Sequence, residues 1–549
     1  MQHLLPEVSL PASARVDGAL LDAAKAALGI DFSAPSLDSR IALARLRLPV
    51  SLRGGGVRSH VETTHPAFVG MMVKTIPCLI DRVDDSGEVR RGFFHSQLVG
   101  HLGAGSFDAG SLAPFAAFIA SGGPSALAFE SAWDSMVAEV GDSVDDNSVF
   151  LEPARSIAVD RCNQKSLTAA LEQVRYRLLE DRVLMSPRLD FHRIAFHSVD
   201  STSGMWLHAI PTASFRPSVD EFREIAAAYF GMPSPIASRF EGQPIYSAKG
   251  DQRGTCDKYG ARLVSLQLAG DGWNTAHDYF KHALCEVLRD LKVDFSCEVF
   301  GLFSSLIPQG PRRSALDADT AAAARARQGL VPDFKIDSGS IGRKLLGASA
   351  ISSFLAELKF IHLGTVRYPQ SVTGRGKHRH AVFRRAGRVG PEMDAAARRC
   401  DVEFGGHPAG QDGPVLQRLR SYGGVVPLVV GHFGEWSSEL SQMVTELAEE
   451  AAPRMAVLFG ASSSRAAKST IQFYARRSLV WAGCIANARL KASRSIYVGP
   501  TWAAAATRRQ EAARSDDRAF ARYRDAAASW HSHHQRSPGA NPWGRAFRD

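Results

Sequence analysis

The stretch from Phe354 to Ile361 is apolar apart from two charged residues. Its order, Phe-Leu-Ala-Glu-Leu-Lys-Phe-Ile, is rich in β-prone residues and holds no helix cap or turn signal, so the pattern predicts a strand. Because side chains alternate between the faces of a strand, Glu357 and Lys359 point the same way. An acid and an amine in an apolar strand cost free energy unless something compensates them. A bound divalent cation would compensate them.

A second acid lies upstream, where Pro332-Asp333 opens another acidic strand. Carboxylates on neighbouring strands suit Mg²⁺ (or Mn²⁺), which takes few carboxylates and keeps several waters. The ion would polarise a phosphodiester and lower the pKa of a bound water, while Lys359 orients that water or offsets developing charge. Asp333 and Glu357 are therefore candidate metal ligands and, with Lys359, candidate catalytic residues. The alternative is a surface ion pair on an edge strand.

Glu298 is a further candidate metal ligand. It lies among apolar residues in a strand predicted over residues 293–303, where a carboxylate again needs a partner. An ion pair with an arginine would explain the same acid.

These acids and the lysine form a recognisable pattern. Pro332-Asp333 followed by Glu357-Leu358-Lys359 resembles the signature of the PD-(D/E)XK nucleases. That resemblance implies a Mg²⁺-dependent hydrolase of phosphodiester bonds. It also implies an α/β (α+β) fold, in which a restriction-endonuclease-like mixed sheet is flanked by helices.

The order of the flanking segments extends the likeness. An amphipathic helix opens at His277-Asp278, the nuclease acids follow, and the apolar run 425–431 precedes another helix. In this order the region of about 245–460 is similar to the C-terminal restriction-like endonuclease region of non-LTR retrotransposons. The resemblance implies cleavage of target DNA, RNA of a parent element as a second partner, and a separate polymerase partner, because polymerase motifs are not recognisable in this chain.

The retrotransposon family often carries a zinc knuckle just ahead of the endonuclease. The candidates here are Cys256, His277, His282, Cys285 and Cys297. Structural zinc sites use four ligands at close, paired spacing, and no C-x₂₋₄-C pair occurs in this interval. Zinc is therefore not predicted; if a site persisted, Cys256, His282 and Cys285 would be its remnants.

Basic residues without any acid fill the segment 374–388. Such a run is often a solvated loop. A nuclease must also hold the phosphates that flank its cut, and lysine and arginine do so without reading sequence. On that interpretation the candidate DNA-binding residues are Arg375, Lys377, Arg379, Arg384, Arg385 and Arg388.

Length and composition fit an ordinary globular protein of two or three domains. The chain has 549 residues, 45% of them hydrophobic and 22% charged, with a formal net charge of +9. A basic surplus suits a phosphate-bearing partner, although solubility alone would explain it. An odd number of scattered cysteines favours a reducing compartment, and no apolar run reaches membrane-spanning length. We expect a nuclear or cytoplasmic protein.

Three regions are predicted from these patterns. Residues 1–240 read as mostly helical, with a capping-box helix that begins at Ser218 and ends at Gly231. Residues 241–490 hold the endonuclease-like domain, and 491–549 form a basic helical or disordered tail. Two alternatives to a working nuclease stay open: a catalytically inactive nucleic-acid-binding remnant, and a gene fragment with no function of its own.

Overall fold

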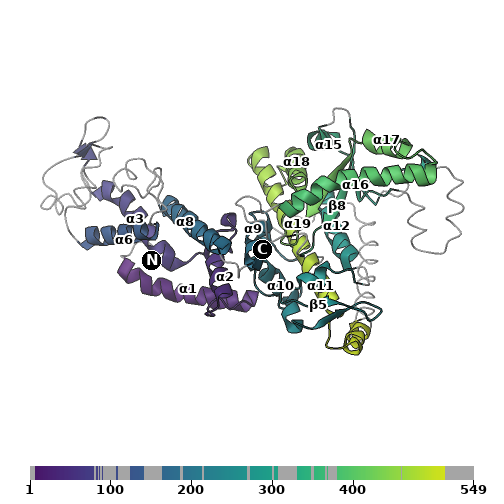
Figure 1. Cartoon of the computed structure of the whole chain (residues 1–549). Coiled ribbons are helices and arrows are strands. Elements are labelled where there is room, and N and C mark those ends of the chain that lie inside the picture. Colours follow the sequence, from purple (N-terminus) through teal and green to yellow (C-terminus); the bar gives the residue numbers. More distant parts are fainter. Residues whose placement is uncertain are drawn as a thin grey trace.

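Helices dominate the chain and enclose small sheets. The computed structural model describes residues 6–79, 82–83, 86, 89–90, 107–108, 124–140, 164–185, 190–212, 215–268, 272–298, 302–306, 330–347, 351–364, 368, 380–458 and 460–512. In Figure 1 the helices from the start of the chain form a lobe on the left, and the sheet with its helices forms a larger body on the right.

The N-terminal lobe is a group of mutually packed helices. Helix α3 lies at its centre, in contact with α1, α6 and α8. Its apolar residues Phe68 and Val69 are almost completely buried, as expected for a helix surrounded by others. Short strands β1 (Arg82–Val83), β2 (Val89–Arg90) and β3 (Phe107–Asp108) form a small sheet in the same part of the chain. The helices are α1 (Pro6–Leu28), α3 (His60–Leu79), α6 (Pro124–Val140) and α8 (Gln164–Met185).

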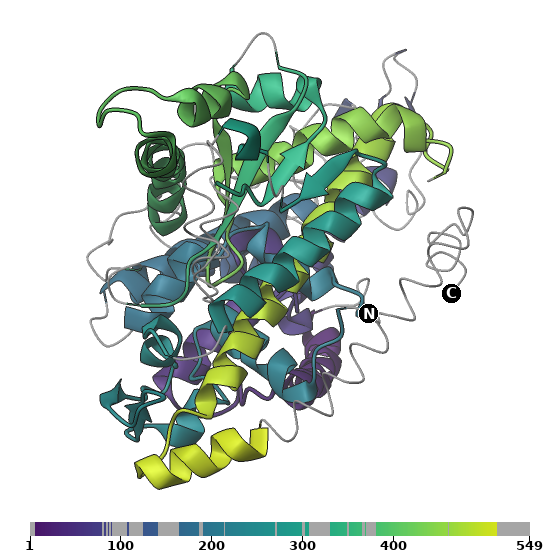
Figure 2. The same cartoon turned by 90° about the vertical axis from the view of Figure 1, so that its right-hand side faces the viewer.

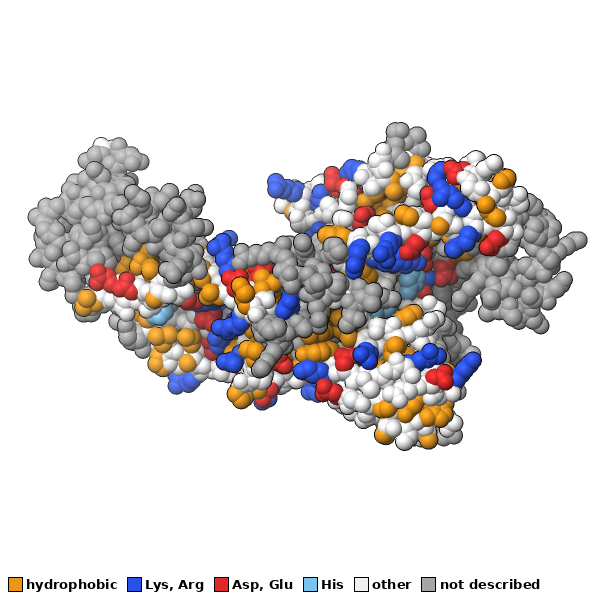
Figure 3. All heavy atoms as spheres, viewed as in Figure 1, with side chains coloured by type: hydrophobic (Ala, Val, Ile, Leu, Met, Phe, Trp, Pro, Cys, Tyr) orange, Lys and Arg blue, Asp and Glu red, His pale blue; other side chains and the backbone are white. Residues whose placement is uncertain are grey.

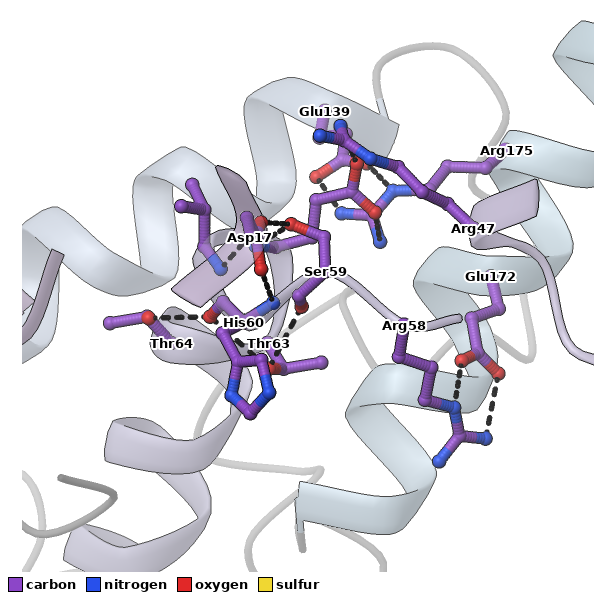
Figure 4. Close-up of polar contacts among 12 residues, drawn as sticks. Asp17, Arg47, Arg58, Ser59, His60, Thr63, Thr64, Glu139, Glu172 and Arg175 are labelled. Atoms are coloured by element: carbon purple, nitrogen blue, oxygen red, sulfur yellow. Dashed lines mark hydrogen bonds and ion pairs between the residues drawn. The ribbon is translucent and has the colours of Figure 1, made fainter. Parts of the chain in front are cut away.

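A buried aspartate joins α1 to the start of α3 (Figure 4). The Asp17 carboxylate accepts a hydrogen bond from the Ser59 hydroxyl and another from the backbone N–H of His60, at 2.6 Å. An acid at a helix N-terminus satisfies backbone donors that the helix itself leaves unpaired. Nearby, Arg58, two residues before α3, pairs with Glu172 of α8, with Nε and Oε1 2.8 Å apart.

Helices α2 (Leu37–Arg47), α9 (Asp190–Ser198) and α10 (Val219–Phe230) connect the lobe to the sheet body. The predicted capping box at the start of α10 is confirmed: the Ser218 hydroxyl accepts from the Glu221 N–H, and the Glu221 carboxylate accepts from the Ser218 N–H. Gly231 ends the helix in the left-handed region, at φ +76°, a conformation that glycine adopts without steric cost.

The larger body is built on a four-stranded mixed sheet in the order β6-β7-β8-β9. Strands β6, β7 and β8 are antiparallel neighbours, and β8 pairs with β9 in parallel. The strand predicted from residue 354 is confirmed as β8. The strand predicted over 293–303 is much shorter, because Glu298 has a left-handed backbone (φ +46°) directly after β6. The strands are β6 (Phe295–Cys297), β7 (Phe334–Ile336), β8 (Phe354–Phe360) and β9 (Val425–Val430).

Long helices cover this sheet. Figure 2 shows α12 and α19 running side by side along the body, and α19 also contacts α18. The Phe280 ring of α12 meets the Phe360 ring of β8 edge to face, with 5.5 Å between centroids. Helix α16 packs on β9 and on α17. The helices of this body, short ones included, are α11 (Ala261–Ser265), α12 (Gly272–Asp290), α15 (Gly339–Leu346), α16 (His380–Gly405), α17 (Pro414–Ser421), α18 (Ser438–Met455) and α19 (Ser464–Ser495).

A single core runs through both sides of the predicted boundary at residue 240. Phe191 and Phe230 belong to the same buried cluster as Phe334 and Leu479. A second small sheet, β4 (Pro244–Tyr246) with β5 (Gln252–Thr255), lies just after that boundary. The division into 1–240 and 241–490 is thus not matched by a break in the apolar core, and it stays a prediction.

The predicted tail starts inside α19, and residues 502–512 form one more helix. Residues 513–549 lie outside the described residues. The same is true of 315–328, an alanine-rich and charged run that predicts a helix over the sheet or a lid. Among the described helices, none combines the length and apolar composition that a bilayer crossing requires.

Candidate active site

The candidate acids come together where β6, β7 and β8 are paired. Cys297 of β6 pairs with Phe334 of β7, which in turn pairs with Ala356 of β8. Asp333 precedes Phe334 in the chain, whereas Glu298 follows Cys297 and Glu357 follows Ala356, so the three acids lie on the same side of this row of paired residues. The backbone N–H of Glu298 donates to the Asp333 carbonyl at 2.9 Å. The backbone N–H of Asp333 in turn donates to Oε2 of Glu357 at 3.3 Å. Sheet pairing therefore sets Asp333 between the other two acids.

The Asp333 carboxylate is held from two sides. Its Oδ2 accepts from the backbone N–H of Leu358 at 2.9 Å and lies 3.2 Å from Nε2 of His277. Burial opposes ionisation of Asp333, but the hydrogen bond and charge of His277 outweigh it, so the pKa of Asp333 lies below its ordinary value. Asp333 is therefore an anion at neutral pH.

Glu357 and Lys359 contact each other, as their spacing on one strand face predicts. Nζ of Lys359 donates to Oε1 of Glu357 at 2.5 Å. Glu357 is 8% exposed, whereas the Lys359 side chain is 31% exposed and reaches solvent. Burial and the negative charge of Asp333 raise the pKa of Glu357, against the opposing effect of Lys359. A proton or a cation between the two carboxylates would relieve their repulsion.

Helix α12 brings a histidine and a lysine to this cluster. His277 and Lys281 lie one turn apart on the same helix face. His277 lies between Asp278, at 3.1 Å, and Asp333. Burial opposes protonation of His277, but the bonds to Asp333 and Asp278 raise its pKa above the ordinary value. The sequence marks His277 as the start of an amphipathic helix and as a zinc-knuckle candidate, whereas α12 begins earlier, at Gly272. The spacing of His277 from Lys281 was the available signal for its place in this cluster.

Glu298, the third predicted metal ligand, faces Lys281. Its carboxylate forms an ion pair with the Lys281 ammonium, which is also 3.1 Å from Asp278. The Glu298 side chain is 46% exposed. The partner is thus a lysine, where the alternative interpretation expected an arginine. Its role as a metal ligand stays a prediction.

Two neighbouring carboxylates fit a Mg²⁺ ion better than they fit zinc. Within the described ranges, no group of three or more His, Cys, Asp or Glu side chains is arranged to hold a metal. Mg²⁺ commonly takes only one or two carboxylates and completes its shell with water and substrate phosphate. Asp333 and Glu357 meet that requirement.

The remnants considered for zinc are dispersed. Cys256 is buried in a separate apolar cluster with Ile245 and Val498. His282 lies 3.2 Å from Glu286 of the same helix. Cys285 lies against Cys297, with 2.7 Å between the two sulfur atoms.

The predicted DNA-binding residues divide into two groups. Arg375, Lys377 and Arg379 lie outside the described residues. Arg384, Arg385 and Arg388 lie in the first half of α16, where Arg384 and Arg388 are exposed. Arg385 forms an ion pair with Glu392, 2.8 Å from Nη1 to Oε1. On the face shown in Figure 3, Lys and Arg side chains are interspersed with Asp and Glu side chains. The excess positive charge of the chain is therefore not gathered into one large basic patch on that face.

A separate cleft of about 640 Å³ lies in the N-terminal lobe. It is lined by the first turns of α3 and α8, with Arg58, His60 and Lys165 among its residues. It contains none of the candidate catalytic residues.

Comparison of the chain with protein-family models finds no match, and comparison with curated proteins finds none. The candidate site is therefore defined by its residues and their geometry alone.

Proposed function

We propose that this protein is a Mg²⁺-dependent DNA endonuclease of the PD-(D/E)XK type, of retroelement origin. The observation that carries the proposal is the bonding of Asp333 to β8: its backbone N–H donates to Oε2 of Glu357, and its carboxylate accepts from the Leu358 N–H. The Lys359 amine is bonded to the same Glu357 carboxylate. A mixed sheet flanked by helices, with a histidine-bearing helix before the acids, agrees with the order that the resemblance implies.

Each side chain has a defined task in this proposal. Asp333 and Glu357 hold the metal ion, and Mn²⁺ would serve in place of Mg²⁺. When bound, the ion supplies positive charge to the scissile phosphate and lowers the pKa of a coordinated water. Lys359, partly open to solvent, orients the attacking water and offsets the negative charge that develops on the phosphate oxygens.

His277 and the Leu358 backbone position the Asp333 carboxylate. Both bond to Oδ2 of Asp333, which fixes the carboxylate plane and leaves Oδ1 for another partner. Burial and the negative charge of Asp333, which together raise the pKa of Glu357, are the electrostatic reason for a cation here. A divalent ion would favour the charged form of both carboxylates.

Exposed arginines supply the proposed contact with DNA. Arg384 and Arg388 are one helical turn apart on α16 and both reach solvent. Phosphate contacts of this kind add affinity without base specificity and weaken as salt increases. The opposing hypothesis, an inactive nucleic-acid-binding remnant, would retain these arginines and lack cleavage.

A plasmid-nicking assay tests the proposal. We expect the full chain to nick supercoiled DNA with Mg²⁺ and not with EDTA. Asp333→Asn, Glu357→Gln and Lys359→Ala should each lose activity by on the order of 100-fold or more. Glu449→Gln is the matched control, because Glu449 is an exposed acid of α18 paired with Lys468.

Circular dichroism of each variant shows whether the fold persists. A wild-type chain that is inert with both Mg²⁺ and Mn²⁺, or a Glu357→Gln variant with full activity, would show that the proposal is wrong. An inert chain that still retards DNA in a gel would favour the inactive remnant.

A further inference from the structure

Two cysteines from different elements meet beside the candidate active site. Cys285 lies on α12 and Cys297 is the last residue of β6. Their Sγ atoms are 2.7 Å apart, and both are free thiols. Unbonded sulfur atoms normally stay further apart, and a disulfide brings them to about 2.05 Å. The pair therefore lies in a position from which only a small approach is needed to form a bond.

We propose that Cys285 and Cys297 are an oxidation site that forms a reversible disulfide between α12 and β6. A peroxide is the oxidant: the Cys297 thiolate attacks one peroxide oxygen and becomes a sulfenic acid, releasing hydroxide. The Cys285 sulfur then displaces the sulfenic oxygen, which leaves as water, and the two sulfurs are joined. A dithiol reductant reverses the step, since it becomes a disulfide as the two thiols are restored.

Exposure assigns different tasks to the two thiols. Cys297 is exposed, whereas Cys285 is 6% exposed. An oxidant thus reaches Cys297 first, and the buried partner behind it resolves the sulfenic acid before further oxidation. The other described cysteines lack such a neighbour; the Cys256 sulfur, for example, lies 3.7 Å from the Ala237 carbonyl.

The disulfide would join the two elements that flank the Lys281–Glu298 ion pair. Lys281 lies one turn before Cys285 on α12, and Glu298 directly follows Cys297. Because the sulfurs are already adjacent in this arrangement, closing the bond leaves His277 and Lys281 where they are. The disulfide is therefore a staple that stabilises α12 on the sheet edge and leaves catalysis intact. The part of this inference that concerns catalysis rests on the proposed nuclease function.

Mapping of thiols in the full chain tests the disulfide. The protein is treated with hydrogen peroxide, denatured, alkylated and analysed as non-reduced peptides by mass spectrometry. We expect a cross-linked peptide containing Cys285 and Cys297, a loss of two alkylation sites from the seven cysteines, and recovery of both with dithiothreitol. Cys297 oxidised to sulfinic acid while Cys285 still alkylates, or a cross-link to a different cysteine, would overturn the proposal.

Serine variants separate the pair from other thiols. Cys285→Ser and Cys297→Ser should each abolish the cross-link, whereas Cys400→Ser on α16 should retain it. The oxidised wild type should melt at a higher temperature than the reduced protein, and Cys297→Ser should show no such difference. An equal melting temperature in the two wild-type states would refute the staple.

Nicking by oxidised and reduced protein tests the link to catalysis. Equal activity in both states supports a staple, and loss of activity on oxidation that Cys297→Ser prevents would overturn that part of the inference. If neither state nicks DNA, the proposed nuclease function fails while the thiol mapping still decides the disulfide.

Discussion

The ammonium group of Lys491 on α19 hydrogen-bonds to the carboxylate of Glu224 on α10, 267 residues earlier in the chain. Their side chains are only 3% and 2% exposed. Lys491 also donates to the Tyr259 carbonyl at 3.0 Å, and Glu224 accepts from the Ser234 hydroxyl at 2.6 Å. This pair ties the end of α19 to the region before the four-stranded sheet.

Removal of one partner of this pair should strongly destabilise the protein. Lys491→Met leaves the buried Glu224 carboxylate without its cationic partner, and we expect a loss of about 3–5 kcal/mol in the free energy of unfolding. The double variant Lys491→Met with Glu224→Met should recover much of that loss. Denaturant unfolding measures both. Arg489→Met is the control, because it breaks a partly exposed pair with Glu221 on the same two helices and should cost about 1 kcal/mol or less.

A buried acid of α16 caps α17. The Asp401 carboxylate accepts from the backbone N–H groups of Val415, at 2.9 Å, and Leu416, at 3.1 Å. Because the residue before this helix is Gly413, which has no side chain to cap it, Asp401→Ala should cost about 1–3 kcal/mol in unfolding free energy. Asp412→Ala, which removes an exposed partner of Arg420, should change stability much less. Equal effects of the two would contradict the capping role.

Acid should destabilise the folded chain through His432. The side chain is buried, and neither ring nitrogen has a hydrogen-bond partner in the described residues. Burial, together with the charges of Lys491 and His362, lowers its pKa well below the ordinary value of 6.5. Below pH 6.5 the unfolded chain binds a proton at this histidine that the folded chain does not bind. The free energy of unfolding therefore decreases as the pH is lowered, with a slope of up to about 1.4 kcal/mol per pH unit.

Unfolding midpoints measured between neutral pH and mild acid check this prediction. His432→Leu should flatten the decline in unfolding free energy, whereas His208→Gln, at an exposed position, should leave it unchanged. If the free energy of unfolding of the wild type does not decrease at pH values below the ordinary histidine pKa, the role assigned to His432 is wrong.

Metal binding can be detected without any cleavage. A ligand that binds only the folded state stabilises it, by about 2.7 kcal/mol at a hundred times its dissociation constant. We expect Mg²⁺ to raise the melting temperature of the wild type and EDTA to reverse the shift. Asp333→Asn and Glu357→Gln should remove the shift, and Glu449→Gln should retain it. If Mg²⁺ raises the melting temperature of all these variants equally, the ion binds at a site other than Asp333 and Glu357.

Local patterns predicted much of the architecture. The apolar, β-prone run without a cap or turn signal identified β8, and the alternation of side chains along a strand set Glu357 and Lys359 on one face. The cap at Ser218 and the glycine at 231 gave both ends of α10. These features depend on neighbouring residues, so they can be read from a short window.

Contacts across long sequence separations could not be read in this way. His277 reaches Asp333 across 56 residues, because α12 packs over the sheet, and nothing near His277 specifies that packing. The predicted strand after residue 293 ended early for a similar reason: the left-handed backbone of Glu298 accompanies a hydrogen bond to Asp333 that only sheet pairing provides.

The pair between Lys491 and Glu224 has a practical consequence for expression of residues 241–549 on their own. A fragment that starts at residue 241 would retain the lysine and lose its counterion, along with α9 and the contacts that α10 makes with α19. Such a fragment would be prone to misfold or aggregate. A shortened protein intended for biochemistry should instead begin before Asp190, so that both helices remain.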